Sequence, residues 1–170
     1  KERFSMETDA IKKFILQIPF FKAFNDNELN KLVGRDKVFK DCKKGGFVFE
    51  EGDPGSSLFV LLFGEIDLVK KGEGGTESII LQLKSGALFG EVAMLTGNTR
   101  NLDARAASTK VVVMEFNKKF IEKMIPSIQS KFEKQLLLIC ARNLDQMNMR
   151  YAALESSIEI REKLGEQGDI

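Results

Sequence analysis

Two apolar-rich segments, separated by a single glycine, make up the stretch Leu58-Phe59-Val60-Leu61-Leu62-Phe63-Gly64-Glu65-Ile66-Asp67-Leu68-Val69. Each segment has the length of a β-strand, and the glycine between them permits a tight turn. The alternation continues on both sides, with Phe47-Val48-Phe49 before this stretch and Ile79-Ile80-Leu81 after it. Strands that recur roughly every 8–12 residues with glycine turns are typical of antiparallel sandwiches, barrels and jelly rolls, and not of βαβ units.

Glycine is concentrated in the middle of the chain, since only two of the 14 glycines lie outside residues 34–97. Residues 98–164 contain none, so helices can run there without a breaker. Two further strands, Asn101–Ala106 and Val111–Phe116, are expected after the last of the strands above. We therefore divide the chain into a helical lead over residues 1–36, a β core over 37–116 and C-terminal helices over 117–170.

The N-terminal lead carries two helix signals. Apolar residues within Thr8–Leu16 recur at helical spacing, and the pattern ends before Pro19. Asn25 followed by Glu28 has the arrangement of a capping box, which predicts a helix running through Val33.

The C-terminal region predicts two helices, one capped by Asn117 and running through Ile125, and one that begins at Pro126 and reaches Leu164. The second helix would span roughly 58 Å, longer than a barrel of this size. It carries apolar residues in the 3-4 spacing of a coiled coil, here named the apolar seam: Leu137, Cys140, Leu144, Met147, Tyr151, Leu154 and Ile158. We expect a homodimer through the distal half of this helix; packing within a longer chain or partial disorder is the alternative.

Composition excludes several function classes. Twenty-six Lys and Arg residues balance 25 Asp and Glu residues, which argues against nucleic acid as a partner. The chain has no histidine, so histidine-based catalysis and imidazole metal sites are excluded. Cys42 and Cys140 form no CxxC pair, and we expect two thiols in a reducing, cytoplasmic compartment.

No apolar run is long enough to cross a bilayer, so we expect no membrane segment. The chain begins at Lys1 instead of Met. We therefore expect a fragment, which leaves room for an output domain outside it.

One segment, Phe89-Gly90-Glu91-Val92-Ala93-Met94-Leu95-Thr96-Gly97-Asn98-Thr99-Arg100, has the composition of a ligand site. Gly90 predicts a tight turn that feeds a single helical turn, whose free N–H groups attract an anion. Arg100 could complete a cage for one phosphate with a bidentate contact. A carboxylate accepts hydrogen bonds, so a ribose hydroxyl is the natural partner of Glu91. One phosphate, one sugar and an apolar enclosure describe a nucleotide of low net charge.

This segment resembles the phosphate-binding cassette of cyclic nucleotide-binding domains, whose pattern is Phe-Gly-Glu-(Leu/Val)-Ala followed by Pro-Arg and a small residue. The resemblance extends from about Ile11 to Phe132, through Ile18–Leu29, Phe47–Gly55 and Leu58–Ile66. It implies an eight-stranded antiparallel jelly roll, or double-stranded β-helix, with N-terminal helices, a cassette over residues 86–106 and a long C-terminal helix.

The resemblance also implies roles for individual residues. Gly90 and Ala93 would offer backbone groups to the ligand, Glu91 would bind the ribose 2′-hydroxyl, and Arg100 would bind the cyclic phosphate. The remaining ligand-binding candidates are Val92 within the cassette helix, Asn101 and Leu102 beside the nucleotide, and Leu68 as a wall for the base. The ligand would be cAMP, with cGMP as the alternative. Its capture would move the C-terminal helices.

Three positions depart from the family pattern: Thr99 replaces the proline, Asn101 the usual Ala, Ser or Thr, and Asp103 the common Thr or Ser. The Asn101 amide could read either purine. If the Asp103 carboxylate points into the site, it would repel a phosphate or pair with Arg100; if it faces solvent, the cost is small.

The sequence thus predicts a non-catalytic, cyclic nucleotide-binding regulatory module. The alternative is a jelly-roll scaffold or dimerisation domain with a vestigial cassette, in which Glu91 and Arg100 only brace each other. A cupin-type metal enzyme shares the barrel shape but is disfavoured by the absence of histidine.

Overall fold

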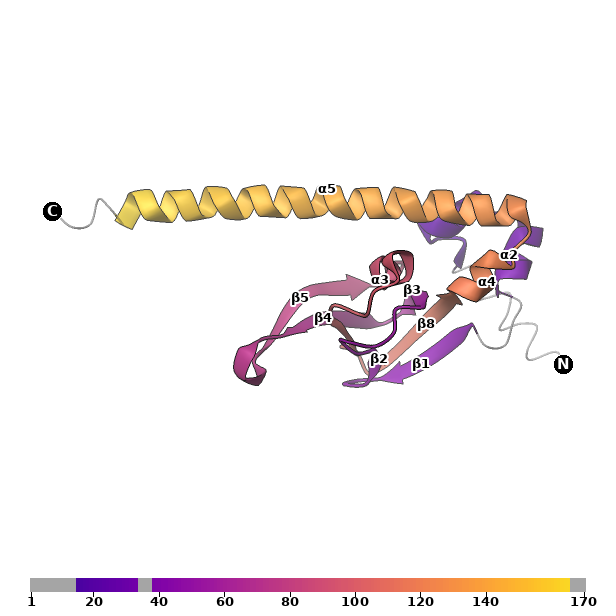
Figure 1. The fold of residues 1–170 in the computed structure, drawn as a ribbon, viewed down its shortest axis with the longest axis horizontal. Helices are drawn as coiled ribbons and strands as arrows, with labels where there is room; N and C mark the ends of the chain where they lie inside the picture. The colour runs from indigo at the N-terminus through magenta and orange to yellow at the C-terminus, as the bar shows by residue number, and fades with distance from the viewer. Residues whose placement is uncertain (1–14, 34–37, 166–170) are drawn as a thin grey trace. The chain divides into compact units, whose positions relative to one another are not determined.

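The computed structural model describes residues 15–33 and 38–165 (Figure 1). The chain divides into two units, Lys1–Phe132 and Glu133–Ile170. The helix predicted over Thr8–Leu16 lies almost entirely outside the described residues.

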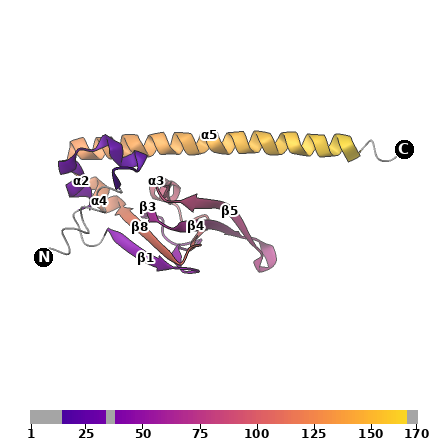
Figure 2. The same ribbon diagram turned by 180° about the vertical axis from the view of Figure 1, so that it is seen from behind.

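Eight antiparallel strands form two four-stranded sheets in the first unit (Figures 1 and 2). The strands are β1 (Phe39–Lys43), β2 (Phe47–Phe49), β3 (Ser57–Phe63), β4 (Glu65–Lys71), β5 (Glu77–Lys84), β6 (Leu88–Phe89), β7 (Asp103–Ala106) and β8 (Lys110–Asn117). One sheet has the order β1-β8-β3-β6 and the other β2-β7-β4-β5. The predicted eight-stranded jelly roll with flanking helices is confirmed. A short 3-10 turn, η2 (Glu73–Gly75), joins β4 to β5.

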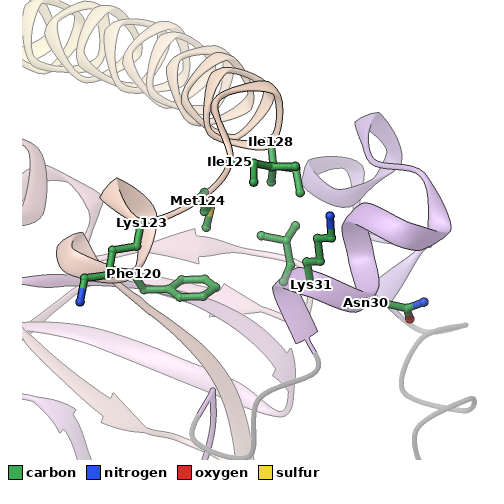
Figure 3. A pocket seen from close by; sticks show the side chains of 8 residues that line it. Asn30, Lys31, Phe120, Lys123, Met124, Ile125 and Ile128 are labelled. Carbon is green, nitrogen blue, oxygen red and sulfur yellow. The ribbon is translucent and has the colours of Figure 1, made fainter.

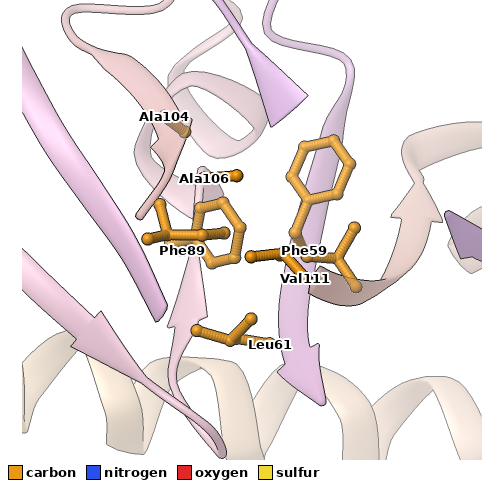
Figure 4. Packing of buried hydrophobic residues seen from close by; sticks show 8 residues of the cluster. Phe59, Leu61, Phe89, Ala104, Ala106 and Val111 are labelled. Carbon is orange, nitrogen blue, oxygen red and sulfur yellow. The ribbon is translucent and has the colours of Figure 1, made fainter. Parts of the chain in front are cut away.

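The core lies between the two sheets, where alternate residues of each strand point inward. Its central cluster consists of Phe59, Leu61, Ile66, Phe89, Ala104, Ala106, Val111 and Val113 (Figure 4). Both sheets contribute to this cluster, so its burial joins them face to face.

Strand β3 is buried on both faces, which explains its continuous apolar sequence. Its inward residues enter the central cluster, and aromatic rings cover the outer face of its sheet next to β8. The Phe116 ring of β8 lies 5.2 Å from the Phe132 ring and 6.3 Å from the Phe21 ring, measured between centroids. Phe20 packs against Phe132 at 4.9 Å. These contacts tie the N-terminal helices and residues 126–132 to the jelly roll.

The N-terminal lead forms η1 (Pro19–Ala23) and α2 (Asp26–Val33). The predicted capping box is present, because the Glu28 N–H donates to the Asn25 side chain at 3.0 Å and the Asn25 N–H to the Glu28 carboxylate at 2.9 Å.

The C-terminal helices are α4 (Lys118–Glu122) and α5 (Pro126–Gly165). The Asn117 side chain accepts the Phe120 N–H at 2.8 Å, as its predicted role as an N-cap requires. The prediction that α4 reaches Ile125 was wrong. Because proline disfavours the helical conformation in the residue before it, the chain turns between the two helices.

In the second unit, helix α5 continues without a break, so the predicted seam lies on one helix face. The large apolar residues of the seam are exposed, from 47 % for Ile158 to 70 % for Leu137. None of the helices in the described ranges is long and apolar enough to span a membrane.

Candidate functional site

The cassette contains one short helix, α3 (Glu91–Thr96), between two glycines in the left-handed conformation. Gly90 has a φ of 76° and Gly97 a φ of 74°, which confirms the predicted turn and single helical segment. A Cβ atom at Gly90 would lie 2.8 Å from the Arg100 Nη1 atom and 3.2 Å from the Phe49 ring. Both the backbone conformation and the limited space therefore require glycine at this position.

Arg100 is buried beneath this turn, with 4 % of its surface exposed. Its Nη1 donates to the Gly90 carbonyl and its Nη2 to the Ser57 carbonyl, both at 2.6 Å. The guanidinium carbon lies 4.3 Å from the centre of the Phe49 ring, a cation–π contact. Among the described residues, the buried Arg100 Nε has no hydrogen-bond partner. A buried cation with an unused donor is an arrangement that an anion would complete.

Burial lowers the pKa of Arg100, and the charges of Asp53, Glu115 and Glu91 act in the opposite direction. An arginine starts so far above neutral pH that the side chain stays protonated. The guanidinium therefore keeps its positive charge.

The structure brings some of the predicted site residues together. Gly90 contacts Arg100 directly, and the carboxylate of Glu91, which is 7 % exposed, acts electrostatically on the same guanidinium. Ala93 is buried, whereas Val92 is 54 % exposed on the outer face of α3.

The other predicted site residues lie on strands or next to them. Asn101 is exposed and its carbonyl accepts a hydrogen bond from Lys70 at 3.1 Å, while Leu102 is half-buried. Leu68 is half-buried and packs against the central cluster, which includes Phe89, the residue before Gly90.

Asp103 neither points at Arg100 nor faces solvent, so neither alternative considered from the sequence is correct. Its carboxylate is fully buried and accepts the Glu51 N–H at 2.7 Å and the Lys71 ammonium at 2.9 Å. Burial acts to raise the pKa of Asp103, but the Glu51 N–H and Lys71 hold that pKa below its usual value. The negative charge is thus neutralised by Lys71 and not by Arg100.

Sequence reasoning assigned no role in the site to the loop between β2 and β3. Gly52 donates its N–H to the Arg100 carbonyl, and Arg100 donates its N–H to the Asp53 carbonyl, both at 2.9 Å. Pro54 pairs with Thr99 in a β-bridge. Gly55 lies so close to α3 that a Cβ there would be 2.4 Å from the Ala93 Cβ. The Gly52-Asp53-Pro54-Gly55 sequence was the available signal, but a turn motif does not reveal its neighbours.

A surface pocket of about 350 Å³ lies apart from the cassette, between α2, α4 and the first turn of α5 (Figure 3). Its floor is apolar, formed by Leu32, Phe120, Met124, Ile125 and Ile128, and its remaining lining residues are Asn30, Lys31 and Lys123. None of the predicted ligand-binding residues lines it.

The structure is thus an antiparallel jelly roll whose short glycine-flanked helix lies beside a buried arginine. The profile of the cyclic nucleotide-binding domain family matches residues 39–127. This match covers more than half of the chain, and the chain belongs to the cyclic nucleotide-binding domain family.

Individual relatives agree with this assignment. A cAMP-dependent protein kinase regulatory subunit of Yarrowia lipolytica is 30 % identical over 112 residues, which cover 66 % of this chain and 28 % of that protein. A cGMP-dependent protein kinase of Caenorhabditis elegans is 25 % identical over 132 residues, which cover 76 % of this chain and 17 % of the kinase. The chain therefore spans less than a third of either relative.

The fold is also shared with solved structures. A cyclic nucleotide-binding domain from Methylobacillus flagellatus superposes with a TM-score of 0.68 at 21 % identity, covering 83 % of both chains. The regulatory domain of Toxoplasma gondii PKA, solved with cAMP, superposes with a TM-score of 0.64 at 16 % identity, covering 80 % of this chain and 52 % of that one.

Proposed function

We propose that the chain binds cAMP in the cassette and acts as a non-catalytic regulatory module. The observation that carries this proposal is the buried Arg100 guanidinium, whose Nε has no partner among the described residues. A cyclic phosphate supplies one negative charge and several acceptor oxygens, which suit such a donor. Because Asp103 is paired with Lys71, its charge does not compete with the phosphate for Arg100.

In this proposal each cassette residue has a separate task. Arg100 binds the cyclic phosphate, Glu91 accepts the ribose 2′-hydroxyl, and Gly90 and Ala93 contribute backbone groups. Asn101, Leu102 and Leu68 lie around the base, and Val92 belongs to the cassette helix without a polar contact of its own. The purine choice rests on similarity, because the Yarrowia lipolytica relative at 30 % identity is named a cAMP-dependent kinase subunit. The Asn101 amide leaves cGMP as the alternative.

Titration calorimetry of the chain with cAMP and with cGMP tests the proposal. Arg100→Ala should weaken cAMP binding by about 2–5 kcal/mol, because a charge-assisted contact to the phosphate is lost. Arg142→Ala is the matched control, since Arg142 is exposed on α5 and, in the part of the chain that the structure describes, donates only to the Leu138 carbonyl of its own helix. If the wild-type chain binds neither nucleotide, the chain is a scaffold with a vestigial cassette.

We also propose that nucleotide binding is relayed through the start of α5. Residues 126–132 pack on the jelly roll through Ile128 and Phe132, which are 1 % and 0 % exposed. A shift of the cassette can reach α5 only through such contacts. Hydrogen exchange of residues 126–132 should change when cAMP is added, and unchanged exchange would remove the relay from the proposal.

A second copy of this chain is the proposed partner of the distal half of α5. The apolar seam is exposed along the described part of the second unit, and an exposed stripe with coiled-coil spacing is stabilised by pairing. Arg150 and Glu155 occupy the g and e positions that flank the seam. In a parallel, in-register pair, Arg150 of one copy would face Glu155 of the other.

Sedimentation and cross-linking test this pairing. In a parallel, in-register dimer Cys140 meets its own counterpart, whereas in an antiparallel dimer paired through the distal half of α5 the two Cys140 residues lie apart along the helix. Mild oxidation of a Cys42→Ser variant should therefore give a covalent dimer, and Cys140→Ser should give none. A monomer in sedimentation would refute the dimer. Neither Cys42 nor Cys140 forms a disulfide within the described residues, which suits the cytoplasmic location that we propose.

A further inference from the structure

The position of Arg100 depends on a loop that does not belong to the cassette. Residues 50–53 lie beside the end of the cassette, and the Gly52 N–H and Asp53 carbonyl form a pair of 2.9 Å hydrogen bonds with the backbone of Arg100. The guanidinium can reach the Gly90 and Ser57 carbonyls only while this backbone stays in place. Whatever fixes the loop therefore fixes the charged group of the site.

Asp103 is the side chain that holds this loop. Its Oδ1 accepts the Glu51 N–H at 2.7 Å, directly before the two residues that pair with Arg100. Its Oδ2 contacts the Lys71 ammonium of β4 at 2.9 Å, which anchors the carboxylate to the sheet. The carboxylate has no exposed surface, so water does not compete for these bonds.

Lys70, the neighbour of Lys71 on β4, also holds the 50–53 loop, through the side chain of Glu51. Its ammonium binds the Glu51 carboxylate and also the Asn101 carbonyl at 3.1 Å. Glu51 is thus held at its N–H by Asp103 and at its carboxylate by Lys70. These contacts connect β4 and the 50–53 loop with Asn101 and Asp103, which follow Arg100 in the sequence.

We propose that Asp103 is a positioning residue of the nucleotide site, which acts through Glu51 and the 50–53 loop to hold Arg100 in its binding position. This inference rests on the proposed function. A carboxylate suits the role because it has two oxygens, one for the N–H of the loop and one for the ammonium of the strand. Asp103, which departs from the family pattern, therefore helps to hold Arg100 in place.

Titration calorimetry with cAMP tests the role through three variants. Asp103→Ala should weaken binding about tenfold to a hundredfold, because the Glu51 N–H loses its acceptor and the loop its anchor. Asp103→Asn should weaken binding less than Asp103→Ala, since an amide oxygen still accepts that N–H while the contact to Lys71 is lost. Asp67→Ala is the matched control and should leave affinity unchanged, because within residues 15–33 and 38–165 the Asp67 carboxylate of β4 accepts a hydrogen bond only from the Gln82 side chain on β5.

A double-mutant cycle separates positioning from general stability. If Asp103 acts through Arg100, the effect of Asp103→Ala should shrink at least threefold when Arg100 is already replaced by Lys. Equal effects in both backgrounds, or unchanged cAMP affinity in a folded Asp103→Ala variant, would overturn the proposal. If Asp103→Ala does not fold, Asp103→Ser takes its place with the same expectation, because a serine hydroxyl is too short to reach both partners.

Amide hydrogen exchange keeps this inference separate from the proposed function. In Asp103→Ala the Arg100 and Gly52 amides should exchange faster than in the wild type, with or without nucleotide. If the wild-type chain binds neither cAMP nor cGMP, the proposed function fails, while faster exchange still supports the positioning of Arg100 by Asp103. Unchanged exchange at these amides would overturn the positioning role even in a chain that binds cAMP.

Discussion

Replacing Gly55 by alanine should damage the cassette through a steric clash alone. A Cβ atom at this position would lie 2.4 Å from the Ala93 Cβ and 2.4 Å from the Asn98 carbonyl oxygen. Ordinary contacts between such atoms are about 3.5–4.0 Å. Both neighbours belong to the backbone or to a side chain without rotatable bonds, so the clash is relieved only if α3 moves by about 1 Å. Overpacking of this kind costs about 1–3 kcal/mol of unfolding free energy.

The matched control is Gly45→Ala in the turn between β1 and β2. Gly45 has a φ of 82° and open space around its missing Cβ, so the cost there is conformational, about 1–2 kcal/mol. Urea unfolding should show both losses, but calorimetry should show weaker cAMP binding for Gly55→Ala only. If Gly55→Ala binds cAMP like the wild type, the cassette is not held against this loop and the reasoning is wrong.

Three further substitutions probe other contacts. Glu91→Gln should weaken cAMP binding by about 1–2 kcal/mol in calorimetry, because an amide oxygen still accepts from a hydroxyl; a loss larger than that of Arg100→Ala would mean that the two roles are misassigned. Phe49→Leu should cost about 1–2 kcal/mol of stability in urea unfolding, since the ring under Arg100 is lost, and an unchanged midpoint would exclude this contact. The Lys131 ammonium lowers the pKa of Glu28 from 4.5. The Glu28 carboxylate therefore contributes its full stabilisation above pH 4.5, and this stabilisation is lost as the pH falls through the lower folded-state pKa. Glu28→Gln should remove this part of the pH dependence of unfolding. Acid unfolding that is the same in Glu28→Gln and the wild type would contradict the prediction.

The fold could be predicted because its signals are local. Glycine turns, alternating apolar residues and caps such as Asn117 act within a few residues of one another, and the structure places strands and caps where these signals lie. The end of α4 was misplaced because the apolar pattern continues through Ile125, while the restriction imposed by Pro126 acts one residue earlier.

The site could be predicted only in part, because its contacts join distant segments. The resemblance carried by Gly90, Glu91 and Arg100 predicted the cassette, and the ligand contacts of these residues stay predictions. The period-two pattern of β7 put Asp103 on the face opposite Ala104, but it could not show that Lys71 and the Glu51 N–H meet the carboxylate there. The identity of a buried partner is set by how strands are aligned in the sheet, which a single sequence does not contain.

The environment of Arg100 explains why this arrangement is stable before any ligand binds. Removing a guanidinium from water is unfavourable unless its donors are satisfied. Two carbonyls and the Phe49 ring offset part of that cost, and the backbone bonds from the 50–53 loop prevent the side chain from swinging out to solvent. The remaining desolvation cost comes from the buried Nε of Arg100, which has no hydrogen-bond partner among the described residues. In the proposed function, a phosphate oxygen that accepts a hydrogen bond from Nε would recover this free energy, and it would do so without having to order the side chain.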